Sequence, residues 1–595
     1  MKGLLHNELL KIRAQSGFKV VMIIVLVIAL LMPLAVAGIE ALDSRSYFDY
    51  DSADYYEEMA EKTQDPIQKA SLLAYAETER LFDESGADDD WRYDNYYYTY
   101  EQLVQQEAGY RLIVVDGEDP TDVNNYMWLA GGFEYGQMII PAWDYTETGE
   151  NVPPSAAEME AYYKQLSDLK ETLKKLIETK DATTFYNAQK VSCGQKITAL
   201  TESIKGLKEQ KPTAAAEKQT VEYELERAEI QLEWMQRLSE NYDMLLRKNA
   251  DPGDWHYTVA VTLLNNIYGD LEESVDPGKE QYFAEQTPFE QYEYYYGSEN
   301  EYIQMIEESY AERLETNKQT RKTANDALEL LNYSLREDAA PIGTVDEGAT
   351  NLESFTSVTA SLVTVFLVVA AALVVANEYS AGTIRLLLIR PRSRRKILAS
   401  KYWAVLIYGG GMALIAFVWQ FICCAIFFGS KELLSAAPMK LFGTVIGMPV
   451  AVTMILYMIL CFLGAWALMS FAFMLAVATR KAALSIVLPL LLQSILKTVT
   501  TITFVLIEAL PKSQGVLAFT PLPYLTPSTL NLDALRYYVA SEGYGMDIGD
   551  FLLGTDMNVL CYRFSALAGA GWMAAFIALF TFIAFRVFRK QEIKS

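Results

Sequence analysis

Long runs of uncharged, mostly apolar residues alternate with charged segments along this chain. The clearest runs cover residues 20–39, 354–377 and 402–430, and charged residues bound each of them at both ends. A helix rises ~1.5 Å per residue, so each run is long enough to cross ~30 Å of bilayer hydrocarbon. These runs predict membrane-spanning helices.

Three later runs predict further spans. Residues 441–479 are uncharged but too long for one ordinary span, so their first part, around residues 443–449, is predicted to be an interfacial or kinked lead-in. Residues 482–507 form an apolar run that Lys497 interrupts, and residues 564–585 form the last. The pattern therefore predicts six spans in all.

The segment between the first and second spans, residues 40–353, contains no further span. Residues 155–180 and 214–249 are rich in Lys, Glu, Leu, Ala and Gln, and Lys211-Pro212 breaks the pattern between them. Apolar residues recur there at helical spacing, which predicts long helices folded as a coiled-coil-like hairpin. A further helix is predicted from residue 299 to 336. The two stripes consist of Leu166, Leu169, Leu173 and Leu176, and of Val221, Leu225, Leu232, Leu238 and Leu245.

The predicted fold class is therefore an all-α membrane protein. Six transmembrane helices carry a large, mainly helical domain inserted between the first and the second. Charge supports this division, because residues 41–350 hold 64 acidic and 27 basic residues, a net charge of −37 within a whole-chain charge of −26. So acidic a domain argues against nucleic acid as a partner. Cys193 is its single cysteine, so no internal disulfide can form there, which is compatible with export by a bacterium that does not rely on disulfides.

Basic residues near the span ends predict the orientation. They gather in residues 1–19, in 378–401 after the second span, at Arg480-Lys481 after the fourth, and in 586–595. With six spans all four groups fall on one side, which the positive-inside rule makes cytoplasmic. Both termini are then cytoplasmic in a multi-pass protein of the bacterial cell membrane. The extracytoplasmic segments are residues 40–353, 431–440 and 508–563.

Ala35-Val36-Ala37 offers an alternative for the N-terminus, because it resembles a signal-peptidase site. The apolar run before it is long enough to span, and an amphipathic segment of 19 residues precedes that run. These features favour an uncleaved first span.

Motifs for catalysis are missing from the sequence. There is no G-x-x-x-x-G-K-[ST] to cradle nucleotide phosphates and no H-E-x-x-H. The two histidines, His6 and His256, are predicted on opposite sides of the membrane, so neither a zinc site nor a histidine-based triad is expected. We expect no enzyme activity, metal site or cofactor of its own in this chain.

Tyrosines cluster beside acidic residues in the large domain, at Tyr55-Tyr56, Tyr96–Tyr98 and Tyr294–Tyr296. One interpretation is a surface that binds a cationic peptide through acidic groups and aromatic faces. The other is ordinary packing beneath a solvated acidic surface. Asp88-Asp89-Asp90 lacks the spaced ligands of a calcium loop and is predicted to be a solvated turn.

The loop after the second span carries the most informative motif. Residues 377–385 read NEYSAGTIR, and residues 390–396 read RPRSRRK. Here the sequence resembles the permease subunits of type-2 ABC exporters, which place E-x-x-x-G-T-[IL] and P-x-[ST]-R elements after their second span. Leu4 to Ile12 and Tyr524 to Ser528 also resemble parts of that family. The likeness covers residues 1–40 and 354–595, and excludes the large domain.

The resemblance implies that this loop is a coupling helix that docks on a separate ATPase. Gly382 permits a close approach or a bend, and Pro391 ends the helix before the next span. The alternative is that the arginines merely hold topology and contact lipid headgroups. The residues assigned to coupling are Glu378, Gly382, Thr383, Ile384, Arg385, Pro391, Arg392, Ser393 and Arg394.

Two further sites follow. Residues 1–19 are predicted to form an amphipathic helix in the cytoplasmic interface, with Leu5, Leu9 and Ile12 on one face and Glu8 beside them. The resemblance makes this helix an elbow beside the coupling loop, whereas a plain anchor is the alternative. Lys497 either faces a substrate path or snorkels to the outer boundary, in which case residues 498–510 would form a short re-entrant helix.

The function implied by the resemblance is that of the permease of an ATP-driven exporter. It would pair with itself or a paralogue in the lipid bilayer and with two ATPase chains, which bind ATP and Mg²⁺. Its substrate would be peptide-like or lipid-like, or it would confer resistance to antimicrobial peptides. The alternative is a non-transporting surface or assembly protein, resembling phage-infection or secretion-accessory membrane proteins. An ion channel has little support, because the spans contain no filter-like polar arrangement.

Overall fold

A computed structural model describes residues 2–14, 16–43, 52–87, 90–135, 138–145, 151–284, 298–380, 393–441, 444–509 and 566–590. The chain divides into two compact units. The first comprises Met1–Leu42, Thr213–Tyr223 and Leu263–Ser595, and the second comprises Asp43–Pro212 and Glu224–Thr262. Helices dominate both, and the strands of the described residues form three two-stranded antiparallel sheets.

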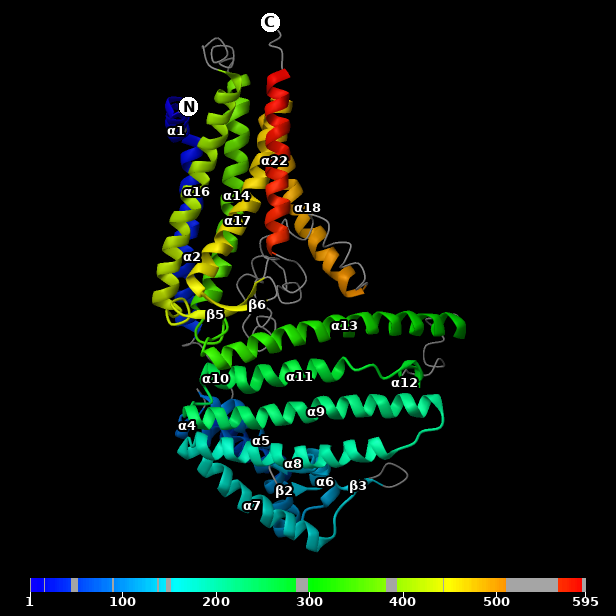
Figure 1. Ribbon diagram of the computed structural model, residues 1–595. Helices are drawn as coiled ribbons and strands as arrows, with labels where there is room; N and C mark the ends of the chain where they lie inside the picture. The colour runs from blue at the N-terminus through cyan, green and yellow to red at the C-terminus, as the bar shows by residue number, and fades with distance from the viewer. Residues whose placement is uncertain are drawn as a thin grey trace. The chain divides into compact units, whose positions relative to one another are not determined.

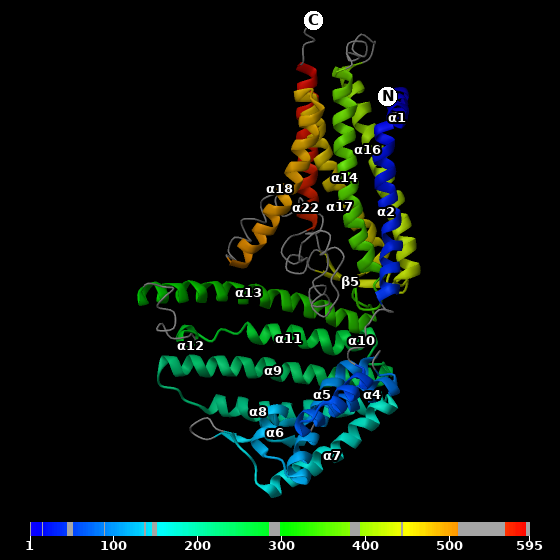
Figure 2. The same ribbon diagram turned by 180° about the vertical axis from the view of Figure 1, so that it is seen from behind.

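The first unit contains the apolar helices. Five helices of the described residues are long and apolar enough to cross a membrane, which identifies this part of the chain as membrane-protein-like. Figures 1 and 2 show them running alongside one another. They are α2 (Ser16–Asp43), α14 (Gly348–Ser380), α16 (Arg394–Phe427), α17 (Val450–Thr479) and α22 (Ala566–Lys590).

The predicted spans match these helices with shifted ends. α2 and α14 extend past predicted spans 20–39 and 354–377 at both ends, because flanking polar residues continue the helices. The span predicted over residues 402–430 belongs to a helix that begins eight residues earlier and ends at Phe427. The last described helix covers the predicted span 564–585 from Ala566 onward.

The lead-in to the fourth span is a β-hairpin, where the prediction gave an interfacial or kinked start around residues 443–449 and no strand. Strand β5 (Ala436–Leu441) pairs antiparallel with β6 (Thr444–Pro449), with Ala436 opposite Pro449. Pro449 has no backbone N–H to donate and stands as the N-cap of α17. No charge lies between strand β6 and α17, so the uncharged run from residue 441 does not mark the change from hairpin to helix.

The fifth predicted span lies on α18 (Ala482–Ala509), one helix with Pro489 inside it. No separate re-entrant helix divides residues 498–509, so that part of the prediction is wrong for the backbone described here. Its described apolar portion, Ala482–Ile495, is shorter than a full span. The six-span count therefore stays a prediction.

Helices outside the apolar bundle complete the first unit: α1 (Lys2–Ala14), α11 (Leu264–Glu273), α12 (Lys279–Ala284) and α13 (Glu299–Glu337). The helix predicted over residues 299–336 is confirmed as α13. It packs against the β-hairpin, where Lys440 Nζ lies 2.7 Å from Asp326 Oδ1 and 2.6 Å from Glu329 Oε2. A Cβ on Gly447 would sit 3.0 Å from the Tyr333 hydroxyl, so this contact favours glycine.

The second unit is a helical domain with two small hairpins. Its first half contains α3 (Ala53–Lys62), α4 (Pro66–Ser85), α5 (Trp91–Arg111), the π-helix η1 (Leu112–Asp116), α6 (Pro120–Met127) and the 3-10 turn η2 (Leu129–Gly131). β1 (Phe133–Tyr135) pairs with β2 (Met138–Ile140), and β3 (Asp144–Tyr145) pairs with β4 (Asn151–Val152). The second half contains α7 (Ala156–Thr179), α8 (Ala182–Glu209), α9 (Ala215–Lys248) from Glu224 onward, α10 (Trp255–Tyr257) and the π-helix η3 (Thr258–Leu263) to Thr262.

The predicted coiled-coil-like hairpin has a different pairing. Leu166, Leu169 and Leu173 are buried as predicted, but α7 packs on α5. The hairpin partners are α8 and α9, which share a cluster of Ile204, Leu207 and Ala228. The break at Lys211-Pro212 separates these two helices, so the sequence predicts the turn correctly but omits α8 as the partner.

Two of the five described clustered tyrosines pack in the second unit's core. Tyr96 and Tyr97 are buried, and Tyr97 packs on Phe82 at a ring-centroid distance of 5.3 Å. Tyr98 is 73% exposed, and Tyr294–Tyr296 lie outside the described residues. Ordinary packing therefore accounts for the central tyrosines of this cluster.

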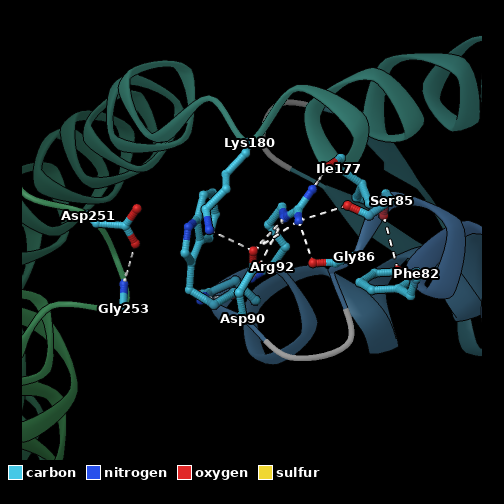
Figure 3. A network of polar contacts seen from close by, with 11 residues as sticks. Phe82, Ser85, Gly86, Asp90, Arg92, Ile177, Lys180, Asp251 and Gly253 are labelled. Atoms are coloured by element: carbon cyan, nitrogen blue, oxygen red, sulfur yellow. Dashed lines mark hydrogen bonds and ion pairs between the residues drawn. The ribbon is translucent and has the colours of Figure 1, made fainter.

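Arg92 clamps three helix ends of the second unit (Figure 3). Its guanidinium donates to the carbonyls of Ser85 at 3.1 Å, Gly86 at 2.8 Å and Ile177. It also pairs with Asp90, which caps α5 by accepting from Arg92 N at 2.9 Å and lies 2.9 Å from Lys180 Nζ. Burial opposes the charge of Asp90, but Arg92 and Lys180 outweigh it and lower its pKa to about 2. Asp90 is thus a helix cap rather than a solvated turn, and Asp88 and Asp89 lie outside the described residues.

Candidate functional site

Helix α1 carries one face of the site. Its Leu5 and Leu9 are partly buried and Ile12 is 3% exposed, and all three pack against the core of the apolar bundle. Tyr408 of α16 donates its hydroxyl hydrogen to the Leu9 carbonyl at 3.1 Å. The predicted apolar face of this segment is therefore an intramolecular packing face within the first unit.

A cluster of four charges joins α1 to the helices that flank residues 381–392. Lys401 Nζ of α16 lies 2.6 Å from Glu378 Oε1 of α14 and 3.1 Å from Glu8 Oε2 of α1. Lys11 Nζ approaches the same Glu378 oxygen at 3.1 Å and Glu8 Oε1 at 3.4 Å. Two carboxylates thus alternate with two ammonium groups, and the cluster is formally neutral.

Three of the four charged side chains in this cluster are largely buried. The Lys401 side chain is 3% exposed, and the side chains of Glu8 and Glu378 are nearly as well covered. Removing charges from water costs several kcal/mol per ion, so each needs its partners. Lys11 is half-exposed; burial lowers the pKa of its ammonium, but Glu378 and Glu8 reverse this and raise the pKa overall.

A second polar junction lies one residue along α16 from Lys401. The Tyr402 hydroxyl lies 2.6 Å from Ser470 Oγ and accepts from Trp466 Nε1 at 2.6 Å. Thr581 Oγ1 of α22 donates to it at 3.2 Å. Lys401 and Tyr402 together connect the start of α16 to α1, α14, α17 and α22.

The predicted coupling residues divide between described and undescribed parts of the chain. Glu378 belongs to the charge cluster, Ser393 caps α16 without a side-chain cap hydrogen bond, and Arg394 is exposed at its first turn. Gly382, Thr383, Ile384, Arg385, Pro391 and Arg392 lie outside the described residues, as do residues 524–528. Tyr379, next to Glu378, stacks beneath Arg480 with 5.3 Å between the guanidinium and the ring centroid. Lys497 lies on α18, and its side chain is outside the described part.

Lys401 is the residue that sequence reasoning misses. It counts there as one of several basic residues that set orientation, yet it is buried between two carboxylates. One signal points to it: Glu378 directly follows one long uncharged run and Lys401 directly precedes the next. Charges at facing ends of neighbouring spans are natural partners, but the pattern gives no sign that Glu8 joins them.

The arrangement suits mechanical connection between the three helices. Its carboxylates are neutralised, and among the described residues no group of three His, Cys, Asp or Glu could hold a metal ion. The cluster fixes the last turn of α14, the first turns of α16 and the middle of α1 as one assembly. A force applied to the segment between α14 and α16 would reach all three helices.

Comparisons with known proteins give limited matches. Residues 331–524 match a family model described as "Protein of unknown function (DUF2705)". A segment of 65 residues is 49% identical to a Bacillus subtilis (strain 168) protein described as "Uncharacterized protein YhcI". That segment covers 11% of this chain and 21% of the relative, so the match spans about a fifth of the relative's length. No solved structure matches.

Proposed function

We propose that this chain is the membrane-spanning permease of an ATP-driven exporter of the type-2 ABC class. The charge cluster of Glu8, Lys11, Glu378 and Lys401 carries the proposal. A permease without its own nucleotide motif must receive motion from a separate ATPase through a cytoplasmic contact. A loop whose two flanking helices are tied to each other and to α1 is suited to receive it, because the three helices would move as one body.

The proposal extends the orientation predicted from the basic residues. Both termini and residues 381–392 would face the cytoplasm, and the acidic domain would lie outside. The permease would form a homodimer or heterodimer with two ATPase chains, which bind ATP and Mg²⁺. A large outer domain suggests a peptide-like or lipid-like substrate, or defence against cationic antimicrobial peptides.

A second candidate function is that of a surface or assembly protein that transports nothing. The observation that favours it is the size of the second unit, whose helices carry no span among the described residues. Such a protein would need no ATPase. Its spans would serve only to hold the helical domain at the membrane.

Partner capture separates the two candidates. The full chain is purified from its native membrane, and the co-purified proteins are quantified by mass spectrometry. A matched sample carries Arg385→Glu, Arg392→Glu and Arg394→Glu. A control carries Arg395→Glu and Lys396→Glu, two exposed positions that directly follow the P-x-[ST]-R element. We expect a stoichiometric ATPase with a Walker motif in the wild-type and control samples, and its loss from the motif variant.

The other outcomes are equally informative. An ATPase retained in the motif variant would keep the exporter and remove the coupling role from these arginines. An ATPase lost from both variants would mean that charge, rather than the motif, holds it. Absence of an ATPase from intact wild-type protein would favour the surface-protein function.

A further inference from the structure

A proline inside α2 leaves one backbone carbonyl without its helical donor, and a side chain of α16 supplies a donor instead. Pro33 has no N–H, so the carbonyl of Ala29, four residues earlier, has lost its usual helical donor. Gln420 Nε2 donates to that carbonyl at 3.2 Å, and Trp419 Nε1 donates to the Leu30 carbonyl at 2.9 Å. A side chain of a neighbouring helix thus satisfies the carbonyl that proline frees within an apolar span, and a second one binds the next carbonyl along α2.

The same Gln420 amide is anchored on α14. Its nitrogen also lies 2.7 Å from Thr359 Oγ1 and 3.5 Å from the Phe355 carbonyl. Two carbonyl neighbours require a donor, which fixes the nitrogen on this side and the oxygen on the other. Gln420 Oε1 therefore points away from these contacts, and it has no hydrogen-bond partner among the described residues.

A second unpartnered polar atom belongs to a residue that lines the same cavity as Gln420. Thr356 Oγ1 of α14 has no hydrogen-bond partner in the described part of the chain. Thr356 is 4% exposed and Gln420 is fully buried. Buried polar atoms are nearly always hydrogen-bonded, and leaving one unpaired costs about 1–3 kcal/mol. Two such atoms on residues that line one cavity indicate a site for a polar group.

Both residues line one cavity between α14, α16 and α17. Its volume is ≈ 10 Å³, close to the minimum that holds one water molecule. No charged side chain is among its lining residues, and apolar side chains supply most of the wall. They include Val363, Phe417, Met458 and Phe462.

We propose that this cavity binds a single uncharged hydroxyl group, which donates to Gln420 Oε1 and accepts a hydrogen bond from Thr356 Oγ1. A hydroxyl both donates and accepts, whereas an ammonium only donates and a carbonyl only accepts. A charged ligand would have no counter-ion in a wall of this composition. The hydroxyl belongs either to water or to the polar end of a small amphipathic molecule. This inference does not depend on the proposed transport function.

Hydroxyl-radical footprinting of the full chain in lipid nanodiscs tests the site. Radicals generated from a bound water oxidise the side chains beside it, and Met458 lines the cavity. Thr356→Val keeps the shape but removes one of the two polar partners, and its hydroxyl makes no bond to the described protein. We expect Met458 oxidation to fall severalfold in this variant relative to Met469, which is buried and does not line the cavity.

The matched control is Thr364→Val on the same helix, whose hydroxyl bonds to the Ala360 carbonyl at 2.7 Å and does not line the cavity. It should leave Met458 oxidation unchanged. Adding 1-hexanol distinguishes the sources: protection of Met458 assigns the site to an organic hydroxyl, and no protection assigns it to water. Equal oxidation of Met458 in the wild type and in Thr356→Val would overturn the proposal.

Discussion

Lys401 Nζ lies 2.6 Å from Glu378 Oε1, and this pair bridges the two helices that flank residues 381–392. The lysine is almost fully buried, and a second carboxylate, that of Glu8, lies 3.1 Å from it on α1. A buried ion pair depends on this geometry, because bulk water cannot solvate either charge if the other partner is lost.

Removal of this lysine should destabilise the protein strongly. Lys401→Met leaves Glu8 and Glu378 with Lys11 alone, so the free energy of unfolding should fall by about 3–5 kcal/mol. Lys396→Met, at an exposed position five residues earlier on α16, should change it by less than about 0.5 kcal/mol. The thermal unfolding midpoint in detergent compares them. Adding Glu378→Gln to Lys401→Met should recover part of the loss, and no recovery would contradict the assignment.

The guanidinium of Arg92 is expected to hold the second unit together. Arg92→Ala leaves three helix-end carbonyls without their donor and takes the guanidinium away from Asp90, so the unit should lose about 3 kcal/mol. Arg92→Lys should recover little, because an ammonium cannot reproduce the planar fork. Hydrogen exchange of residues 85–95 in the full chain measures this. Arg111→Ala, exposed at the other end of α5, is the control, and equal exchange in both alanine variants would refute the clamp.

Glu432, in the segment between α16 and the β-hairpin, predicts that the stability of the fold depends on pH. This residue is fully buried, and Gly343 N donates to its carboxyl group. Asp346 stands nearby and accepts from the N–H groups of Lys431 at 2.9 Å and Glu432 at 3.2 Å. Burial, aided by the charge of Asp346, raises the pKa of Glu432 from 4.5 to about 7.

The fold therefore favours the protonated Glu432. Its contribution to stability is fully present below pH 4.5 and is lost as the pH rises through about 7, a loss of about 3 kcal/mol. Thermal midpoints measured from pH 4.5 to 8 should show this fall in the wild type and a smaller fall in Glu432→Gln. Glu347→Gln makes the same change at an exposed neighbour and should give the same pH profile as the wild type. Identical profiles for Glu432→Gln and the wild type would contradict the prediction.

Gln420 and Pro33 make a rescue experiment possible. Gln420→Leu leaves the Ala29 carbonyl without a donor and should lower stability by about 1–2 kcal/mol. Pro33→Ala supplies an N–H that can donate to that carbonyl, so it should restore much of the loss in the Gln420→Leu background. Thermal midpoints of the four proteins give the coupling energy. Additive effects of the two substitutions would mean that the side chain does not serve the proline break.

Some of this architecture can be predicted from local pattern. Uncharged runs predict α2, α14 and α16 because a span is defined by its own residues, and Lys211-Pro212 predicts the turn between α8 and α9. The hairpin before α17 escapes prediction, because no charge separates it from the helix. The partnership of Glu8 with Lys401 escapes too, since it joins residues 393 positions apart and periodicity describes only neighbours.

The bond between Gln420 and the carbonyl freed by Pro33 has a consequence for biogenesis. The two residues it joins are 391 positions apart, so at about 5–20 residues per second the ribosome needs roughly 20–80 s to deliver the second after the first. During that interval the first span must lie in the membrane with the Ala29 carbonyl lacking the hydrogen bond from Gln420. The insertion machinery, a chaperone or lipid-dissolved water must supply a hydrogen-bond donor to this carbonyl until the third apolar helix arrives.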